Sequence, residues 1–300
     1  MAKEIFGANL KMYPVVEGYG EIDNSTHIVT SPSDRAVVDL LSSYVYKGIA
    51  GGRKKDGRGC IVGGKDKEII VFIPFMFLDG LTSIGMLRKN ESKLGAQDVG
   101  EYASGAHTRE TSPVWLNNLN INDVLVGHSE VRDEYEKLMD SCGNTGHREP
   151  IDELFSRKIA NALKYGLRVT YCVGETEEEK KGGLTYRVLE RQIKVGLKSI
   201  GPTGLNQIIM AYEPRWSIGG DKPTPTTTEI KKAHAAIREF LKIYCGVSNP
   251  DCVPILYGGS MKPENAAQIM GIKGVDGGLI GSASLDAEKF AKIVNYDRQA

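Results

Sequence analysis

The chain has 300 residues, of which 41% are hydrophobic and 25% are charged. A chain of this length and composition can bury a sizeable apolar core, so it needs neither a disulfide scaffold nor a structural metal ion to fold. It carries 38 basic and 38 acidic side chains, so its formal net charge is zero and no overall basic field is present to attract nucleic acid.

Eight short apolar runs are the expected strands, and in chain order they are 5–10, 69–73, 93–97, 124–126, 169–173, 207–211, 254–257 and 277–280. Amphipathic segments between them predict helices, the clearest at 34–47, 151–165, 186–200, 227–244 and 263–270. N-caps are expected at Asp34 and Thr227, and helix ends at Gly166, Gly201 and Gly246.

This alternation of strand and helix is typical of a parallel sheet. Eight units favour a single α/β domain over residues 1–300, folded as a (β/α)8 barrel. An open doubly wound sheet is the alternative that periodicity leaves open.

Two segments are expected to be surface excursions from the barrel. Residues 51–68 are rich in glycine and basic side chains, which favours a polar loop on the face opposite the chemistry, with a basic docking patch as the alternative. Residues 133–150 are expected to form a lengthened loop on the catalytic face, as are residues 14–33.

The cysteines and the N-terminal residues bear on the cellular compartment. The five cysteines form no CxxC pair and their number is odd, which favours free thiols in a reducing compartment. Residues 1–14 lack the pattern of a signal peptide, and the longest apolar stretch, 69–78, is too short to span a membrane. We therefore expect a cytoplasmic protein without a membrane partner.

Chemistry in a parallel barrel gathers at the carboxyl ends of the strands. The side chains and turns expected there are Asn9, Lys11, His128, Glu213, Ser260 and Gly281. Each alone has an ordinary structural explanation. Together they place a cation, an imidazole and a carboxylate at one rim, which suits proton abstraction beside a carbonyl on a substrate with an anionic group. The sequence contains no metal-ligand cluster and no nucleotide fingerprint, so we expect neither a metal nor a cofactor.

Six segments, in order and at compatible spacing, resemble the signature segments of the triosephosphate isomerase family. They are GANLKM at 7–12, VLVGHSE at 124–130, YCVGET at 171–176, AYEPRWSIGGDK at 211–222, YGGS at 257–260 and VDGGLIGSASL at 275–285. The resemblance implies a (β/α)8 barrel and an isomerase of glycolysis and gluconeogenesis. Such an enzyme interconverts dihydroxyacetone phosphate and glyceraldehyde 3-phosphate without a cofactor.

The resemblance also implies roles for individual residues. Glu213 would be the general base and His128 the electrophile that donates to the enediolate oxygens. Lys11 would attract the phosphate, Asn9 would donate to a substrate oxygen, and Glu130 would be a further carboxylate of the active site.

Other matched positions would bind phosphate or support the site. The phosphate-binding residues would be Gly219 in a lid over 214–224, and Ser260, Gly281 and Ser282. Gly220 would lie beside Gly219 at the tip of the lid. Cys172 and Glu175 would be structural supports. Family members are usually homodimers, in which the loop at 98–113 inserts beside the partner's lysine and histidine.

The sequence departs from the family pattern at four of these positions. Ser282 replaces a glycine, Arg215 a small aliphatic residue at the first hinge of the lid, Val131 an arginine and Arg109 a glycine. These changes and the lengthened loops motivate two alternatives. The first is an isomerase of a four-carbon ketose phosphate that uses the same chemistry, and the second is a non-catalytic protein that binds a sugar phosphate.

Overall fold

The computed structural model describes residues 3–11, 67–83, 92–219 and 222–298 of the chain. Its strands are β1 Glu4–Asn9, β2 Lys67–Ile73, β3 Ser92–Ala96, β4 Asp123–Val126, β5 Arg168–Val173, β6 Ile208–Tyr212, β7 Ile255–Tyr257 and β8 Gly277–Ile280. All pair in parallel and in sequential order, and β8 pairs with β1, so the sheet closes. The predicted (β/α)8 barrel is confirmed, and the open doubly wound sheet is excluded.

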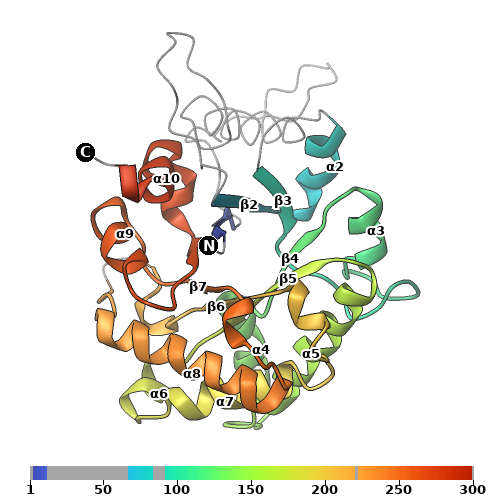
Figure 1. The fold of residues 1–300 in the computed structure, drawn as a ribbon. Helices are drawn as coiled ribbons and strands as arrows, with labels where there is room; N and C mark the ends of the chain where they lie inside the picture. Colours follow the sequence, from blue (N-terminus) through green and yellow to red (C-terminus); the bar gives the residue numbers. More distant parts are fainter. Residues whose placement is uncertain (1–2, 12–66, 84–91, 220–221, 299–300) are drawn as a thin grey trace, which may run out of the picture.

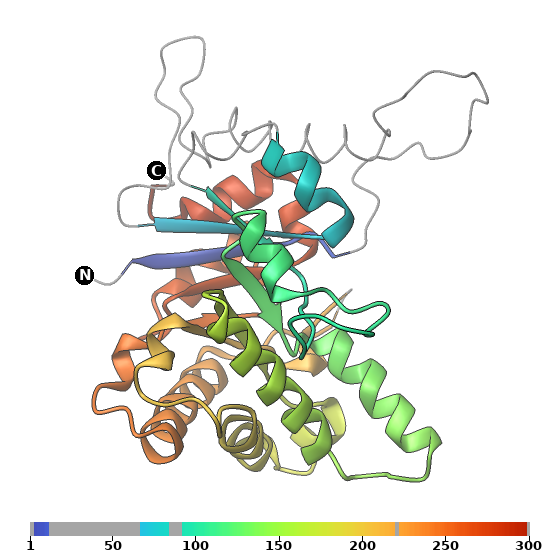
Figure 2. The same cartoon turned by 90° about the vertical axis from the view of Figure 1, so that its right-hand side faces the viewer.

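Helices surround this barrel. They are α2 Phe75–Ser83, α3 Pro113–Asn118, α4 Ser129–Ser141, α5 Glu149–Lys164, α6 Glu177–Lys181, α7 Thr185–Gly196, α8 Thr227–Cys245, α9 Pro263–Met270 and α10 Ala287–Val294. Short 3-10 turns lie at η1 Gly204–Gln207, η2 Arg215–Ser217, η3 Pro250–Cys252, η4 Ser282–Leu285 and η5 Tyr296–Arg298. Figure 1 shows α2 and α3 on one side of the strands, α9 and α10 on the other, and α6, α7 and α8 below them. Figure 2, turned by 90°, shows β1 and β2 side by side, as their pairing requires.

The strands read as continuous apolar runs because both of their faces are buried. On β2, Ile70 and Phe72 join the cluster inside the barrel, whereas Ile69 and Ile73 pack in the layer between the sheet and the helices. A side chain at Gly95 would place its Cβ 2.5 Å from the Phe72 ring. Glycine at this position therefore lets the Phe72 ring fill the barrel interior.

All eight strands lie within two residues of their predicted bounds, and the four predicted helices that fall within the described residues are present. The N-cap of α8 is Thr226 rather than Thr227, because Thr226 and Glu229 bond each other's backbone in a capping box. Gly246 ends α8 in the left-handed conformation, as predicted. Gly201 does not end α7, which stops earlier at Gly196.

Parts of the two predicted surface excursions, 51–68 and 133–150, form regular secondary structure instead of loops. The expectation of a loop over 133–150 is wrong for residues 133–141, which continue helix α4. Charged side chains of both signs make up much of this helix, and its apolar stripe is narrow, with Val131, Tyr135 and Met139 only partly buried against the core. Lys67 and Glu68, expected to end the 51–68 excursion, are buried in β2. The helix predicted at 34–47, the loop at 14–33 and the rest of the 51–68 excursion lie outside the described residues.

Candidate active site

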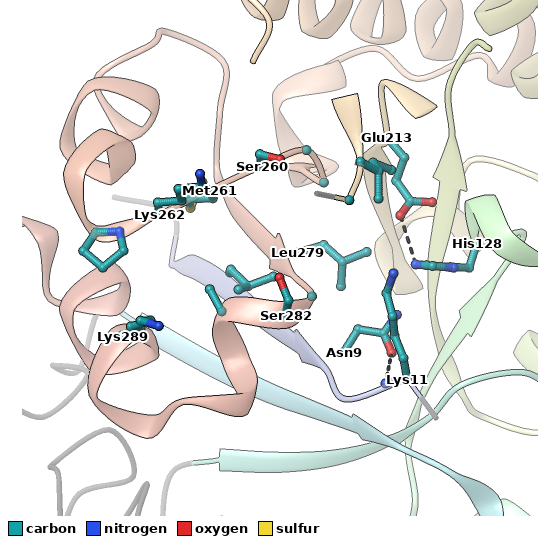
Figure 3. A pocket seen from close by; sticks show the side chains of 18 of the residues that line it. Asn9, Lys11, His128, Glu213, Ser260, Met261, Lys262, Leu279, Ser282 and Lys289 are labelled. Carbon is teal, nitrogen blue, oxygen red and sulfur yellow. Dashed lines mark hydrogen bonds and ion pairs between the residues drawn. The ribbon is translucent and has the colours of Figure 1, made fainter. Parts of the chain in front are cut away.

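A cavity of about 490 Å³ opens at the carboxyl ends of the strands. It is lined by eight of the nine predicted site residues, namely Asn9, Lys11, His128, Glu213, Gly219, Ser260, Gly281 and Ser282. Asn9, Lys11, His128 and Glu213 lie on one side of it, the exposed Lys262 and Lys289 lie on the other, and Ser282 lies between them (Figure 3). The barrel therefore brings together residues from five strand ends that are up to 273 positions apart in the sequence.

Glu213 directly follows β6, and its carboxylate is held at the floor of the cavity. One oxygen, Oε2, accepts a hydrogen bond of 2.8 Å from the backbone N–H of Ser129. The other, Oε1, lies 3.1 Å from Nε2 of His128 (Figure 3). A side chain at Gly174 would place its Cβ 1.8 Å from the Glu213 carbonyl oxygen, so glycine is required where the end of β5 passes the base. Glu213 is only 3% exposed, so little of this residue is in contact with bulk water.

The hydrogen bonds of His128 define its tautomer. This residue caps the N-terminus of α4, and its Nδ1 accepts from the backbone N–H of Glu130 at 3.3 Å. An accepting Nδ1 carries no proton, so the proton of the neutral ring is on Nε2, the atom that faces Glu213 and the cavity.

Lys11 stands just beyond β1 in a left-handed backbone conformation, with φ of 50°. Its Nζ lies 2.6 Å from Oε1 of Glu130. Glu130 does not line the cavity, and it is connected to the site through this ion pair and through its backbone N–H, which bonds His128. A side chain at Gly281 would place its Cβ 3.4 Å from Cε of Lys11, which shows that the lysine stem passes close to the turn after β8. The cation is therefore next to the predicted phosphate-binding turn.

Asn9 is oriented by a residue to which the sequence analysis assigned no role. Its Oδ1 accepts from the backbone N–H of Lys11 at 3.1 Å and from Nε2 of Gln97 at 3.2 Å. Because the carbonyl oxygen is occupied in this way, the Asn9 amide is left with N–H donors for the cavity. Gln97 follows β3, and a polar side chain at the end of an apolar strand is the signal that would have found it.

The predicted supports behind the site are both buried. Burial and the neighbouring charge of Glu213 raise the pKa of the Cys172 thiol well above its usual range, so this thiol is neutral. Glu175 accepts hydrogen bonds from Nε1 of Trp216 at 2.9 Å and from the Tyr212 hydroxyl at 3.1 Å. Burial raises the pKa of Glu175 above its usual value, and these hydrogen bonds oppose the rise. Both residues have surroundings typical of structural supports.

Arg132 is a buried cation that the sequence analysis did not single out. It bonds the carbonyl oxygens of Gly127 and Cys172, each at 3.0 Å, and pairs with Asp152 at 2.7 Å. Burial disfavours its charge, but the interactions with Tyr171 and Asp152 outweigh that effect and raise its pKa. Arg132 therefore connects two parts of the site: the turn before His128, through Gly127, and the end of β5, through Cys172. Its position two residues after the HSE block was the available signal.

The predicted phosphate-binding residues lie on three loops. Gly219 has a φ of 86° and open space around it, whereas Gly220 lies outside the described residues. The Ser260 hydroxyl donates to the backbone oxygen of Ser217 at 2.9 Å and so joins the loop after β7 to the segment after β6. Ser282 begins η4, and its φ does not lie in the left-handed region. Serine therefore replaces glycine there without backbone strain.

Two other departures from the family pattern lie close together. Arg109 has a φ of 84°, a conformation that favours glycine. Arg109 and Val131 both line a second cavity, of about 290 Å³, together with Glu134. A cation at position 109 thus faces the same space as the side chain at position 131.

No described helix is both long enough and apolar enough to cross a membrane. Within the described ranges, no three His, Cys, Asp or Glu side chains are grouped in a way that would hold a metal ion.

Comparisons with known proteins place these observations in context. The family model described as triosephosphate isomerase matches residues 60–297. The triosephosphate isomerase of Thermoanaerobacter sp. (strain X514) is 37% identical over 229 residues, which cover 76% of this chain and 86% of the relative. That of Treponema denticola is 38% identical over 233 residues, covering 78% and 86%. That of Geotalea uraniireducens is 38% identical over 229 residues, covering 76% and 85%.

Proposed function

The chain belongs to the triosephosphate isomerase family, and we propose that it interconverts dihydroxyacetone phosphate and glyceraldehyde 3-phosphate through an enediolate. One observation carries the proposal. The Glu213 carboxylate and Nε2 of His128 are 3.1 Å apart on one side of a cavity that extends past Lys11 to the turn after β8. A small substrate with a carbonyl at one end and a phosphate at the other spans these two regions.

In the proposed mechanism Glu213 is the general base. It removes a proton from the carbon next to the substrate carbonyl and returns it to the neighbouring carbon. The Ser129 N–H holds one carboxylate oxygen at 2.8 Å, so the orientation of the base is set before the substrate arrives. Because one carboxylate both removes and returns the proton, the reaction requires no cofactor.

His128 and Asn9 stabilise the negative charge that develops on the substrate oxygen. As the proton leaves carbon, charge appears on oxygen, and donors already aimed at that oxygen stabilise the transition state more than the ground state. The Nε2–H of neutral His128 and the free amide N–H groups of Asn9 are such donors. A neutral imidazole is also closer in acidity to an enediol than an imidazolium would be, which favours proton exchange between them.

Lys11 and three loops would hold the phosphate. The ammonium of Lys11 supplies the cation, and Glu130 limits its movement through their 2.6 Å ion pair. The backbone N–H groups of Gly219, Gly281 and Ser282 are suited to bind phosphate oxygens because none of these positions is blocked by a bulky side chain. Ser260 acts by joining its loop to Ser217.

We also propose that the enzyme is a cytoplasmic homodimer that uses the loop at 98–113 as a contact. The described cysteines are all free thiols, which supports a reducing compartment. An isologous pairing is the commonest assembly for such an enzyme. The cavity beside Arg109 would then receive part of the partner.

The test is steady-state turnover of triose phosphates and of a four-carbon ketose phosphate, measured in parallel on the wild type and on Glu213→Gln. We expect kcat/KM to be highest for the triose phosphates, and Glu213→Gln to bind substrate with little turnover. A higher kcat/KM for the four-carbon substrate would favour the alternative isomerase. Binding of both substrates without turnover by the wild type would favour a sugar-phosphate-binding protein.

A further inference from the structure

A partly buried cluster of charges joins the segment after Glu213 to helix α4. Arg215 lies in η2, and its guanidinium donates to both carboxylate oxygens of Glu136, at 2.9 and 2.7 Å. It also pairs with Asp133. The side chains of Arg215 and Glu136 are only 7% and 12% exposed. A two-pronged pair of this kind has a defined geometry, unlike a mobile surface ion pair.

The cluster continues along the same face of α4. Asp133, Glu136 and Asp140 are three and four residues apart, so their side chains project from one side of the helix. Arg148, at the start of α5, pairs with Asp140 at 2.8 Å and approaches Glu136 at 4.0 Å. Arg148 therefore anchors α4 from one side, and Arg215 connects the anchored helix to the end of β6.

This arrangement holds the proposed base at two points. At the first turn of α4 the Ser129 N–H bonds the Glu213 carboxylate, and His128 caps the same helix. At the second turn Asp133 and Glu136 hold Arg215, two residues beyond Glu213. Pro214 between them restricts the backbone. A shift of Arg215 relative to α4 would therefore move the base relative to His128.

The carboxylates of this cluster stabilise the positive charge of Arg215. Burial disfavours the guanidinium of Arg215, but its hydrogen bonds and charge interactions with Glu136 and then Asp133 outweigh that effect and raise its pKa. A buried charge that lost its partner would be strongly disfavoured, so the pair resists separation. The same carboxylates explain why an arginine is tolerated at a largely buried position.

We propose that Arg215 is a positioning residue that uses helix α4 to fix the Glu213 carboxylate relative to His128. The inference rests on the proposed function of Glu213 as the base. In this role the arginine that departs from the family pattern at position 215 acts together with the acidic face of helix α4. Arg215 does not line the cavity, so it acts through Glu213 and not on the substrate.

The neighbouring Trp216 provides a readout that does not depend on catalysis. It is 9% exposed, bonds Glu175 at 2.9 Å and lies under Nζ of Lys180, 3.4 Å from its ring centroid. The chain has two tryptophans, and the other, Trp115, is exposed on α3. In a Trp115→Phe background the fluorescence therefore reports on the segment next to Arg215 alone.

The experiment compares four proteins in that background: the parent, Arg215→Met, Arg215→Lys and Glu136→Gln. Methionine keeps apolar length but removes the charge, whereas lysine keeps the charge without the two-pronged geometry. We expect Arg215→Met to lower kcat about tenfold or more, because misplacing a base by a fraction of an ångström has effects of this size. The value of KM should change less than kcat, since Lys11 and the phosphate turns are untouched. Arg215→Lys should recover part of kcat, and Glu136→Gln should lower it in the same direction.

Lys137→Met is the matched control. It removes an exposed positive charge from the same helix but leaves Arg215, both of its carboxylate partners and the Asp140–Arg148 pair in place, so its kcat should equal that of the parent. Fluorescence should show Trp216 more accessible to a neutral quencher in Arg215→Met and unchanged in Lys137→Met.

The outcomes separate this inference from the proposed function. A parent protein without isomerase activity would overturn the proposed function whatever the variants do. An active parent whose Arg215→Met and Glu136→Gln variants keep the parental kcat would overturn the positioning role alone. So would a loss of melting temperature in Arg215→Met with kcat and Trp216 accessibility unchanged. If Arg215→Met does not fold, Arg215→Lys and Glu136→Gln decide the matter by the same criteria.

Discussion

Shortening the proposed base by one methylene tests the geometry of the site most directly. In Glu213→Asp the carboxylate retracts by about 1.5 Å, the length of one carbon–carbon bond. The contact with the Ser129 N–H, now 2.8 Å, and that with Nε2 of His128, now 3.1 Å, would then both exceed hydrogen-bond range. The basicity of the group changes little, so the loss isolates its position.

A misplacement of about 1 Å in a catalytic group costs about 100-fold in rate. This corresponds to about 2.7 kcal/mol of transition-state stabilisation, at about 1.36 kcal/mol for each factor of ten. We therefore expect kcat of Glu213→Asp to fall at least about 100-fold, with a smaller change in KM. The assay is steady-state isomerisation of glyceraldehyde 3-phosphate, with the melting temperature measured alongside to confirm that the fold persists.

Glu264→Asp is the control for this prediction. Glu264 lines the same cavity but is exposed at its mouth, so an identical shortening there should leave kcat unchanged. A folded Glu213→Asp variant with kcat within about threefold of the wild type would refute the assignment of Glu213 as the base.

Three further predictions concern phosphate binding, acid stability and assembly. Lys11→Ala should weaken the binding of a phosphate-bearing inhibitor at least about tenfold, as measured by calorimetry, because it removes a charge-assisted contact; unchanged affinity would place the cradle elsewhere. Burial lowers the pKa of His234 to about 4, below the usual 6.5, so the unfolded chain takes up the proton first as pH falls. The free energy of unfolding should therefore drop by about 2 kcal/mol between pH 6.5 and about pH 5. In denaturant titrations His234→Gln should lose this dependence on pH. An unchanged dependence in the variant would assign the effect to other titrating groups. Shortening the loop at 98–113 should give a monomer of low activity by light scattering, and a fully active dimer would show that the subunit contact lies elsewhere.

The sequence was most informative where signals are local. Strands that are buried on both faces are largely apolar, and all eight could be predicted to within two residues. Helix α8 could be predicted because it combines an amphipathic pattern with a capping signal and a terminal glycine. The site residues could be named because parallel strands deliver their carboxyl ends to one rim, and short motifs mark those ends.

The tertiary structure decided which of these residues touch and what supports them. Helix α4 is held by ion pairs with Arg148 and Arg215. Arg215 is 79 positions from its partner Glu136, so the periodicity of the helix sequence does not predict this ion pair. Gln97 orients Asn9 from 88 positions away. A single polar residue in a sequence does not indicate which residue it contacts, because a hydrogen bond or an ion pair depends on distance in space. Only closure of the barrel sets that distance, and this closure brings Glu213 within 3.1 Å of His128.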